Sequence, residues 1–185
     1  MRIYLIGLPG CGKSTLGKKL ANKIGYQFID MDEYIEKSAC MFIDEIFEQY
    51  GEPYFRALEQ ATLDELKNMD NIVIATGGGI VADIENKKKL DGACVYLSAD
   101  LKTIEKRLEE SSIIRPLLEK ITLEEIYAAR KDKYEAFQDI TVDNFDMDAA
   151  INQILKELDL WKKFLLLMDQ ILICLEEDQR SIMVL

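Results

Sequence analysis

The sequence predicts an α/β domain with a parallel sheet and crossover helices. Three observations predict this fold class: short apolar, β-branched runs recur along the chain, segments of helical periodicity separate them, and Gly-rich or acidic residues follow the runs. The runs are Ile3–Ile6, Tyr26–Ile29, Ile72–Ala75, Ala93–Leu97 and Ile140–Val142. Because ligands bind beyond the carboxyl ends of such strands, the residues after each run are the first candidates for a functional site.

Length and composition restrict the class of protein. The 185 residues suffice for one well-cored domain, and 49% hydrophobic with 31% charged residues is a globular composition. A formal net charge of −11 argues against nucleic acid and anionic membranes as partners. The four cysteines show no CxxC spacing and the chain has no histidine, which argues against a zinc site. The N-terminal run is expected to be a strand rather than a signal peptide, so the reducing cytoplasm is the expected compartment.

The first run leads into a glycine-rich segment, Gly7–Ser14. It fits the phosphate-binding pattern G-x-x-x-x-G-K-[ST] and lies between a predicted strand and a predicted helix that Gly25 ends. Glycines let backbone N–H groups approach phosphate oxygens, while Lys13 would reach the β- and γ-phosphates and Ser14 would face Mg²⁺. A Gly-rich turn without nucleotide is the alternative, which the agreement of strand, loop and helix disfavours.

The second run ends in two aspartates, Asp30 and Asp32. Alternation along a strand sends both side chains the same way, toward the edge where the phosphate loop opens. One carboxylate would order a metal shell, and the other would accept a hydrogen bond from a substrate hydroxyl. In a chain without histidine, proton transfer falls to such a carboxylate or to the substrate. The alternative is a solvated strand end before an acidic helix start.

A turn at Gly51 leads into a predicted helix that carries Arg56 and Glu59. Three residues apart, they share one helical face and can pair. The pair is either an ordinary surface ion pair or a functional pair. In a functional pair, Glu59 would fix the guanidinium plane so that Arg56 binds a carboxylate through two hydrogen bonds.

The third run is followed by Thr76 and the glycines 77–79. Three consecutive glycines cost conformational entropy, which favours a place where backbone approaches a ligand closely; a flexible loop is the alternative.

Further along, Arg115-Pro116-Leu117-Leu118 precedes a predicted helix over Thr122–Arg130, with Tyr134 one turn beyond Arg130. A mobile, arginine-bearing segment suits a lid over phosphate, although each arginine alone could be a solvated charge.

From about Asp159 the chain changes character. Apolar residues occur at helical spacing and on other sides too, and charged residues interrupt the run before it could span a membrane. We interpret residues 159–185 as a helical extension that packs against the domain or against a second copy.

Read together and in this order, the motifs resemble the shikimate kinase family. The resemblance covers about residues 1–158 and rests on Gly7–Ser14, Asp30-x-Asp32, Phe55-Arg56-x-x-Glu59, Gly77-Gly78-Gly79, Arg115-Pro116-Leu117-Leu118 and Arg130-x-x-x-Tyr134. It implies a P-loop kinase of three α/β/α layers, with a five-stranded parallel sheet in the order 2-3-1-4-5. It also implies ATP-dependent phosphorylation of a shikimate hydroxyl to give shikimate 3-phosphate and ADP, in aromatic amino-acid biosynthesis.

The resemblance further implies a role for each matching residue. The ATP-binding residues would be Gly10, Cys11, Gly12, Lys13, Ser14, Thr15, Arg107 and Arg115. Arg107 would pack against adenine and Arg115 would belong to the lid. Ser14 and Asp30 would position Mg²⁺, because the third run ends in Ala75-Thr76 where a second metal-binding aspartate is typical.

On the acceptor side, the implied shikimate-binding residues are Asp32, Arg56, Glu59, Gly77, Gly78, Gly79 and Arg130. Asp32 would bind the shikimate hydroxyls and is the candidate general base; Lys13, Asp32 and Arg115 form the implied catalytic set. Arg56 and Arg130 would bind the carboxylate, with Glu59 orienting Arg56. We expect a cytoplasmic monomer that uses shikimate and ATP, with the C-terminal extension as the candidate surface for self-association.

Two other functions stay open. One is another small-molecule kinase of the same fold, such as gluconate kinase or a nucleoside-monophosphate kinase. The other is a non-catalytic nucleotide-binding module whose tail recruits a partner.

Overall fold

The computed structural model describes residues 1–110, 121–160 and 164. Strands and helices alternate along most of this part of the chain: β1 (Arg2–Ile6), α1 (Lys13–Ile24), β2 (Gln27–Asp30), α2 (Met31–Ala39), α3 (Ile43–Leu66), β3 (Ile72–Ala75), the 3₁₀ turn η1 (Ile80–Ala82), α4 (Asn86–Lys89), β4 (Ala93–Ser98), α5 (Leu101–Glu109), α6 (Leu123–Phe137), β5 (Ile140–Asp143) and α7 (Met147–Glu157). All five predicted strands are present, each within about a residue of its expected bounds.

The five strands form one sheet in the order β2-β3-β1-β4-β5, and every neighbouring pair is parallel. The predicted sheet is therefore confirmed. In register, Leu5 of β1 pairs with Ala75 of β3, and Asp30 of β2 pairs with the same residue. The carboxyl ends of β1, β2 and β3 consequently meet at one edge, which brings together the segments that follow them in sequence.

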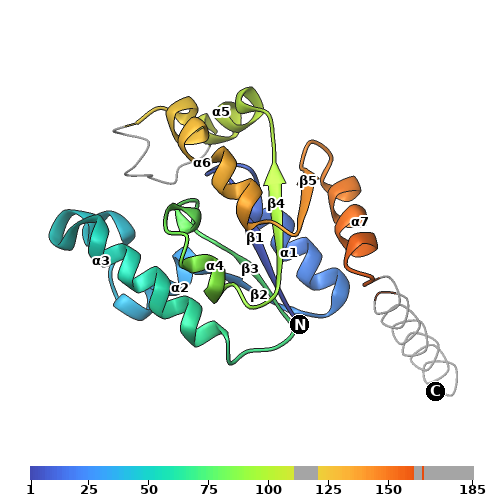
Figure 1. The fold of residues 1–185 in the computed structure, drawn as a ribbon, viewed down its shortest axis with the longest axis horizontal. Helices are drawn as coiled ribbons and strands as arrows, with labels where there is room; N and C mark the ends of the chain where they lie inside the picture. The colour runs from blue at the N-terminus through green and yellow to red at the C-terminus, as the bar shows by residue number, and fades with distance from the viewer. Residues whose placement is uncertain (111–120, 161–163, 165–185) are drawn as a thin grey trace, which may run out of the picture.

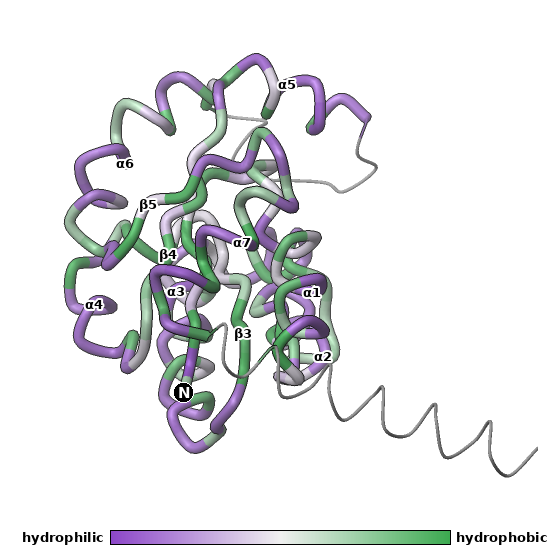
Figure 2. The backbone as a smooth tube through the Cα atoms, turned by 90° about the vertical axis from the view of Figure 1, so that its right-hand side faces the viewer, coloured by the Kyte–Doolittle hydropathy of each residue, from purple (hydrophilic) through white to green (hydrophobic). Residues whose placement is uncertain are grey.

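Helices cover both faces of the sheet, as the predicted three-layer architecture requires. Helices α1 and α7 lie on one face, and α3, α4 and α6 lie on the other (Figure 1). Hydrophobic stretches mark the inner strands such as β3, and hydrophilic stretches recur along the helices around them (Figure 2). The side chains of β1 from Ile3 to Ile6 are completely buried, which makes this central strand the axis of the core.

Helix boundaries follow the local signals in the sequence. Gly25 ends α1 in the left-handed conformation with φ 68°, as predicted. Thr122 and Glu125 form a capping box at the start of α6, which continues past the predicted Arg130 to Phe137. The predicted turn at Gly51 is a kink inside α3, where φ is 77° and ψ is 171°.

The C-terminal extension falls largely outside the described residues. Leu160 is buried in the core, and the Lys23 ammonium lies 5.0 Å from the centre of the Phe164 ring. The expectations for 161–163 and 165–185 fall outside the part of the chain that the structure describes. Within that part, no helix is long and apolar enough to cross a membrane.

Candidate active site

The phosphate loop connects β1 to α1 in the conformation that its glycines permit. Gly7, Gly10 and Gly12 have positive φ values of 146°, 80° and 98°, which residues with a Cβ rarely adopt. The Lys13 ammonium is buried and donates to the carbonyl oxygens of Gly7 and Leu8 at 2.9 Å each. The predicted strand, loop, lysine and helix N-terminus are thus assembled as one anion-binding turn.

Several predicted nucleotide residues lie in this turn or in the first turn of α1. Cys11 is fully buried and has a free thiol, whereas Thr15 is exposed. Cys11 therefore contributes packing and backbone to the loop, and Thr15 is open to a ligand above the helix start.

Ser14 and Asp30, the predicted metal pair, are in direct contact. Ser14 Oγ donates to Asp30 Oδ2 at 2.5 Å, while Asp30 Oδ1 accepts from the backbone N–H of Asp32 at 3.1 Å and caps α2. Two oxygen donors beside a phosphate loop suit Mg²⁺, which usually takes one or two protein ligands together with phosphate oxygens and water. The described residues contain no group of three or more His, Cys, Asp or Glu that could hold a metal without phosphate.

Asp32 reaches the site by a different route from the one the sequence indicated. Strand alternation was the wrong reason, because β2 ends at Asp30 and Asp32 lies in the first turn of α2. The helix start nevertheless points Asp32 toward the same edge, where its Oδ1 faces Gly77. Burial, followed by the negative charges of Asp30 and Glu59, raises the pKa of Asp32 to about 7, and Lys13 opposes this shift.

Arg56 and Glu59 form a largely buried ion pair rather than a surface one. Arg56 Nη1 donates to Glu59 Oε2 at 2.5 Å, and Glu59 is only 1% exposed. On its other side the guanidinium donates to Glu52 Oε1 from Nε and Nη2, at 3.1 and 2.7 Å. Burial raises the pKa of Glu59 and the Arg56 cation opposes that effect. The second oxygen of Glu59, Oε1, is buried without a hydrogen-bond partner among the described residues.

The backbone of the glycine run, residues 77–79, lies close to the side chains of Asp32, Arg56 and Glu59. A Cβ on Gly77 would lie 2.6 Å from Glu59 Oε1 and 3.1 Å from Asp32 Oδ1, and one on Gly79 would lie 2.6 Å from Arg56 Cζ. Neither position has space for a side chain, although neither has a positive φ. The glycine run therefore packs closely against these side chains, and its contact with a ligand stays a prediction.

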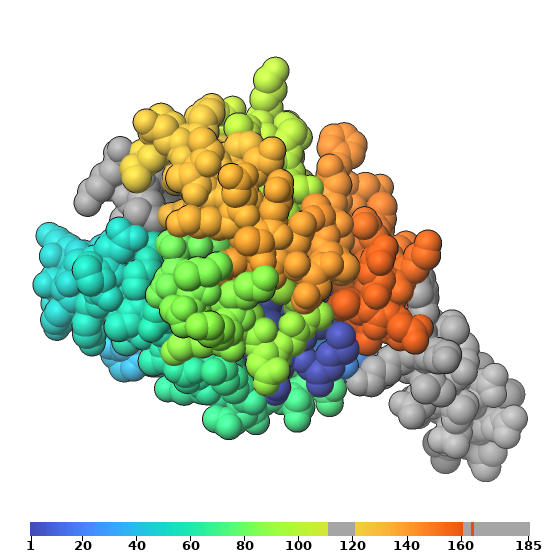
Figure 3. Space-filling model, in the orientation of Figure 1, coloured from blue at the N-terminus to red at the C-terminus, as the bar shows by residue number. Residues whose placement is uncertain are grey.

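Gly78, in the middle of the run, contacts both helix α6 and the phosphate loop. Its carbonyl oxygen accepts from Arg130 Nη1 at 2.9 Å and from the Tyr134 hydroxyl at 2.7 Å, and a Cβ on it would lie 3.0 Å from Pro9 Cδ of the phosphate loop. Tyr134 is fully buried and stacks on Tyr96, with ring centroids 5.0 Å apart. The segment from η1 to α4 lies between helix α3 and helix α6 (Figure 3).

One residue of the phosphate-loop surroundings escaped the sequence analysis. Asn144, directly after β5, is 1% exposed, and its Nδ2 donates to the carbonyl oxygen of Cys11 at 2.8 Å. Arg107 donates from Nη1 to the same oxygen at 3.3 Å and from Nη2 to the Asn144 carbonyl at 3.1 Å. Arg107 is thus beside the phosphate loop, as the nucleotide role requires. The signal for Asn144 was the polar pair Asp143-Asn144 directly after the fifth predicted strand.

Arg115 and the predicted lid motif lie outside the described residues. The nucleotide and catalytic roles assigned to Arg115 therefore stay predictions.

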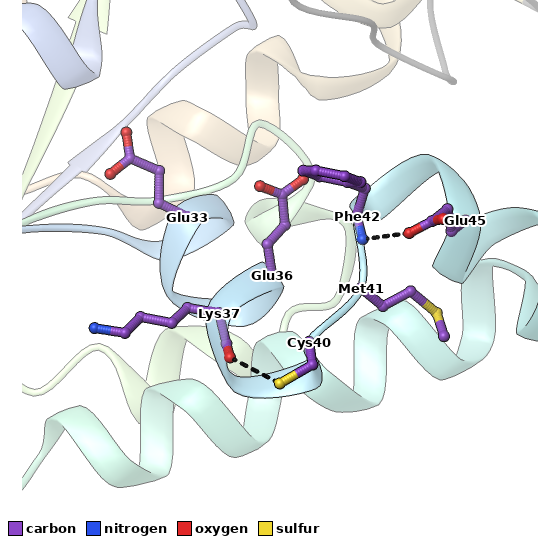
Figure 4. A pocket seen from close by; sticks show the side chains of 7 residues that line it. All are labelled: Glu33, Glu36, Lys37, Cys40, Met41, Phe42 and Glu45. Carbon is purple, nitrogen blue, oxygen red and sulfur yellow. Dashed lines mark hydrogen bonds between the residues drawn. The ribbon is translucent and has the colours of Figure 1, made fainter.

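A pocket of about 370 Å³ lies away from these residues, between the end of α2 and the start of α3 (Figure 4). Its lining consists of Glu33, Glu36, Lys37, Cys40, Met41, Phe42 and Glu45. None of them is a predicted site residue, and they surround no glycine-rich backbone, so the site is the edge assembled above.

Comparison with known proteins gives a consistent result. The family model described as shikimate kinase matches residues 9–159. A shikimate kinase of Alkaliphilus oremlandii is 43% identical over 147 residues, covering 76% of this chain and 87% of its own length. The crystal structure of shikimate kinase from Bacteroides thetaiotaomicron has a TM-score of 0.77 at 29% identity and covers 86% of this chain and 98% of its own. Shikimate kinase from Acinetobacter baumannii, solved in complex with shikimate, has a TM-score of 0.77 at 30% identity and covers 85% and 93%.

Proposed function

The chain belongs to the shikimate kinase family, an ATP-using family of enzymes, and we propose that it phosphorylates shikimate with the residues assembled at this edge. The donor half is the phosphate loop with Lys13 and Ser14. The acceptor half is formed by Asp32, Arg56 and Arg130 around the glycine run. The observation that carries the proposal is the position of Gly78, which is packed against the phosphate loop on one side and bound by Arg130 on the other.

The acceptor half suits a small anion with hydroxyl groups. Arg56 and Arg130 offer guanidinium donors to a carboxylate, and Glu59 keeps the Arg56 plane fixed from a buried position. Asp32 offers carboxylate oxygens to hydroxyls. Glycines 77–79 let the ligand and these side chains approach the backbone closely.

In the proposed mechanism, the chain mainly positions the two substrates. Asp32 accepts a hydrogen bond from the hydroxyl that attacks the γ-phosphorus in line, and takes its proton as the new bond forms. A loose transition state requires little deprotonation at the start, so Asp32 acts more as an orienting group than as a strong base. Lys13 leaves the loop carbonyls to stabilise negative charge on the β- and γ-phosphates, and the sequence assigns Arg115 to the same task from the lid.

Ser14 and Asp30 would hold Mg²⁺ together with ATP oxygens, since both offer oxygen atoms within 2.5 Å of each other. When bound, the ion would supply positive charge that stabilises the phosphates. The chain's own part is to set these two oxygens, through the Asp30 cap on α2, beside the phosphate loop.

The donor and acceptor residues described above all belong to one chain, which supports the expected monomer. We also propose that residues 1–158 form the kinase domain and that residues 159–185 form an extension to it. Light scattering of the full chain tests the first point, and removal of residues 165–185 with kinase activity retained tests the second.

The deciding experiment measures ADP release with ATP and Mg²⁺ after addition of shikimate, with gluconate and nucleoside monophosphates as parallel substrates. Turnover that requires shikimate supports the proposal. Preference for gluconate or a nucleotide would favour another kinase of this fold, and tight ATP binding without any turnover would favour the nucleotide-binding module.

A further inference from the structure

The carbonyl oxygen of Cys11 is held from two separate elements. Asn144 reaches it from the segment after β5, and Arg107 reaches it from α5, so two donors converge on one oxygen of the phosphate loop. Arg107 also donates to the Asn144 backbone carbonyl, which ties the two donors to each other. The backbone N–H of Asn144 in turn donates to Ser98 at the end of β4, at 2.9 Å. The Cys11 carbonyl is thus anchored to the rigid end of the sheet.

The space that Asn144 occupies exists because residue 12 is glycine. A Cβ on Gly12 would lie 2.5 Å from Asn144 Nδ2, and Gly12 has a φ of 98°. The Asn144 amide therefore fills the room that a side chain at position 12 would take. Its Oδ1 is buried with no hydrogen-bond partner among the described residues, so the bond to Cys11 is what fixes the amide.

Holding the Cys11 carbonyl has a consequence for the next N–H group. The Cys11–Gly12 peptide is trans and planar, so its C=O and N–H point to opposite sides. Because Asn144 and Arg107 hold the oxygen on their side of the loop, the Gly12 N–H is directed to the opposite side. Backbone N–H groups of this loop type are the groups that bind nucleotide phosphates.

We propose that Asn144 is a positioning residue for the phosphates of the donor nucleotide, acting with Arg107 through the Cys11 carbonyl. The inference rests on the proposed function for the identity of the donor. It gives Arg107 a second task besides the adenine contact that the family resemblance implies.

The chain contains a closely matched control for Asn144. Asn86 is also buried, its Nδ2 also donates to a backbone carbonyl at 2.8 Å, that of Ile80, and its Oδ1 also lacks a hydrogen-bond partner among the described residues. Replacing either asparagine by alanine removes one buried hydrogen bond of the same kind. Only Asn144 touches the phosphate loop.

The test measures binding of ATP and of inorganic tripolyphosphate, each with Mg²⁺, to the full chain by calorimetry. Asn144→Ala should weaken both ligands about fivefold, the factor that one hydrogen bond of ordinary strength contributes, and Asn86→Ala should weaken neither. Unchanged tripolyphosphate affinity in Asn144→Ala, with a loss of Tm equal to that of Asn86→Ala, would overturn the proposal.

Arg107→Met provides the second variant, at a half-buried position that is easier to change without unfolding. Weaker tripolyphosphate binding supports the bracing role, since this ligand has no base. Weaker ATP binding with unchanged tripolyphosphate binding would reduce Arg107 to a base contact and overturn its part in the brace. Absence of ATP binding by the unmodified chain would instead overturn the proposed function itself, so the two failures are distinguishable.

Discussion

Arg56 Nη1 lies 2.5 Å from Oε2 of Glu59, a carboxylate that is only 1% exposed. The arginine is itself held on its outer edge by Glu52. A guanidinium fixed on two edges retains its remaining donor directions for one ligand geometry. Glu59 and Glu52 together therefore fix the orientation of the Arg56 guanidinium as well as supporting its charge.

Glu59→Ala should lower stability and weaken shikimate binding together. Removing one partner of a buried ion pair costs on the order of 3 kcal/mol when the other charge is left unpaired. Here Glu52 still pairs with Arg56, so the loss should be smaller than that figure. We expect a clear fall in Tm and a raised KM for shikimate at unchanged KM for ATP. Glu52→Ala, on the exposed side of the same guanidinium, is the control and should change Tm much less.

Arg56→Ala and Arg130→Ala should each raise the shikimate KM far more than the ATP KM. Each removes a charged donor from the acceptor half, which costs roughly 2 kcal/mol or about thirtyfold. Steady-state kinetics with each substrate varied in turn measures the split. Lys133→Ala serves as the control, since Lys133 is an exposed cation on α6, the helix that carries Arg130. Equal effects on both KM values would point to misfolding or to a wrong assignment.

Gly79→Ala should disturb shikimate binding through Arg56. The added methyl would lie 2.6 Å from Arg56 Cζ, so the guanidinium has to move. We expect the shikimate KM to rise about tenfold in the single variant. In an Arg56→Ala background the same change should add little, because the group it displaces is gone. Additive effects in this double-mutant cycle would contradict the contact.

Asp32→Asn should lose most turnover, by about a hundredfold or more, because the amide neither orients the hydroxyl as the ionised carboxylate does nor takes its proton. The measurement is kcat at saturating ATP and shikimate. Glu33→Gln changes the adjacent, exposed acid and should keep kcat near that of the unmodified chain. A near-normal kcat for Asp32→Asn would remove Asp32 from the mechanism.

The pKa of Asp32, raised to about 7 by burial and by Asp30 and Glu59, predicts the pH dependence. Only the ionised carboxylate accepts the hydroxyl proton, so kcat/KM for shikimate should rise with pH through 7 and level off above about pH 8. With one titrating group it should be about tenfold lower at pH 6 than at pH 8. The residual activity of Asp32→Asn should lack this step; an unchanged profile in that variant would assign the titration to another group.

The same shift has a consequence for stability. The folded pKa of Asp32 lies above the ordinary value of 3.8, so the folded state holds its proton more tightly than the unfolded state does. Its contribution to stability is present below about pH 4 and is lost as pH rises to about 7. The Tm of Asp32→Asn, relative to the unmodified chain, should therefore increase between pH 4 and pH 8. A constant difference would contradict burial of the charge.

Local patterns in the sequence were sufficient for much of this protein. The β-branched runs specify the strands, Gly25 ends α1, and Gly7–Ser14 forms a phosphate loop, because each depends on interactions between residues close in the chain. The family resemblance supplied the strand order and the set of site residues. Residue spacing alone did not distinguish a functional Arg56–Glu59 pair from a surface ion pair, or a ligand-contacting glycine run from a flexible loop.

Only the tertiary structure shows which contacts these residues make. Burial of Glu59, the contact of Arg56 with Gly79 and the bond from Asn144 to Cys11 each join residues that are separate in the chain. No local pattern encodes such contacts, since they arise when parallel strands bring their carboxyl ends to one edge. Asp32 shows the difference most clearly: the sequence indicated its destination, while the start of α2, not strand alternation, determined how it arrives there.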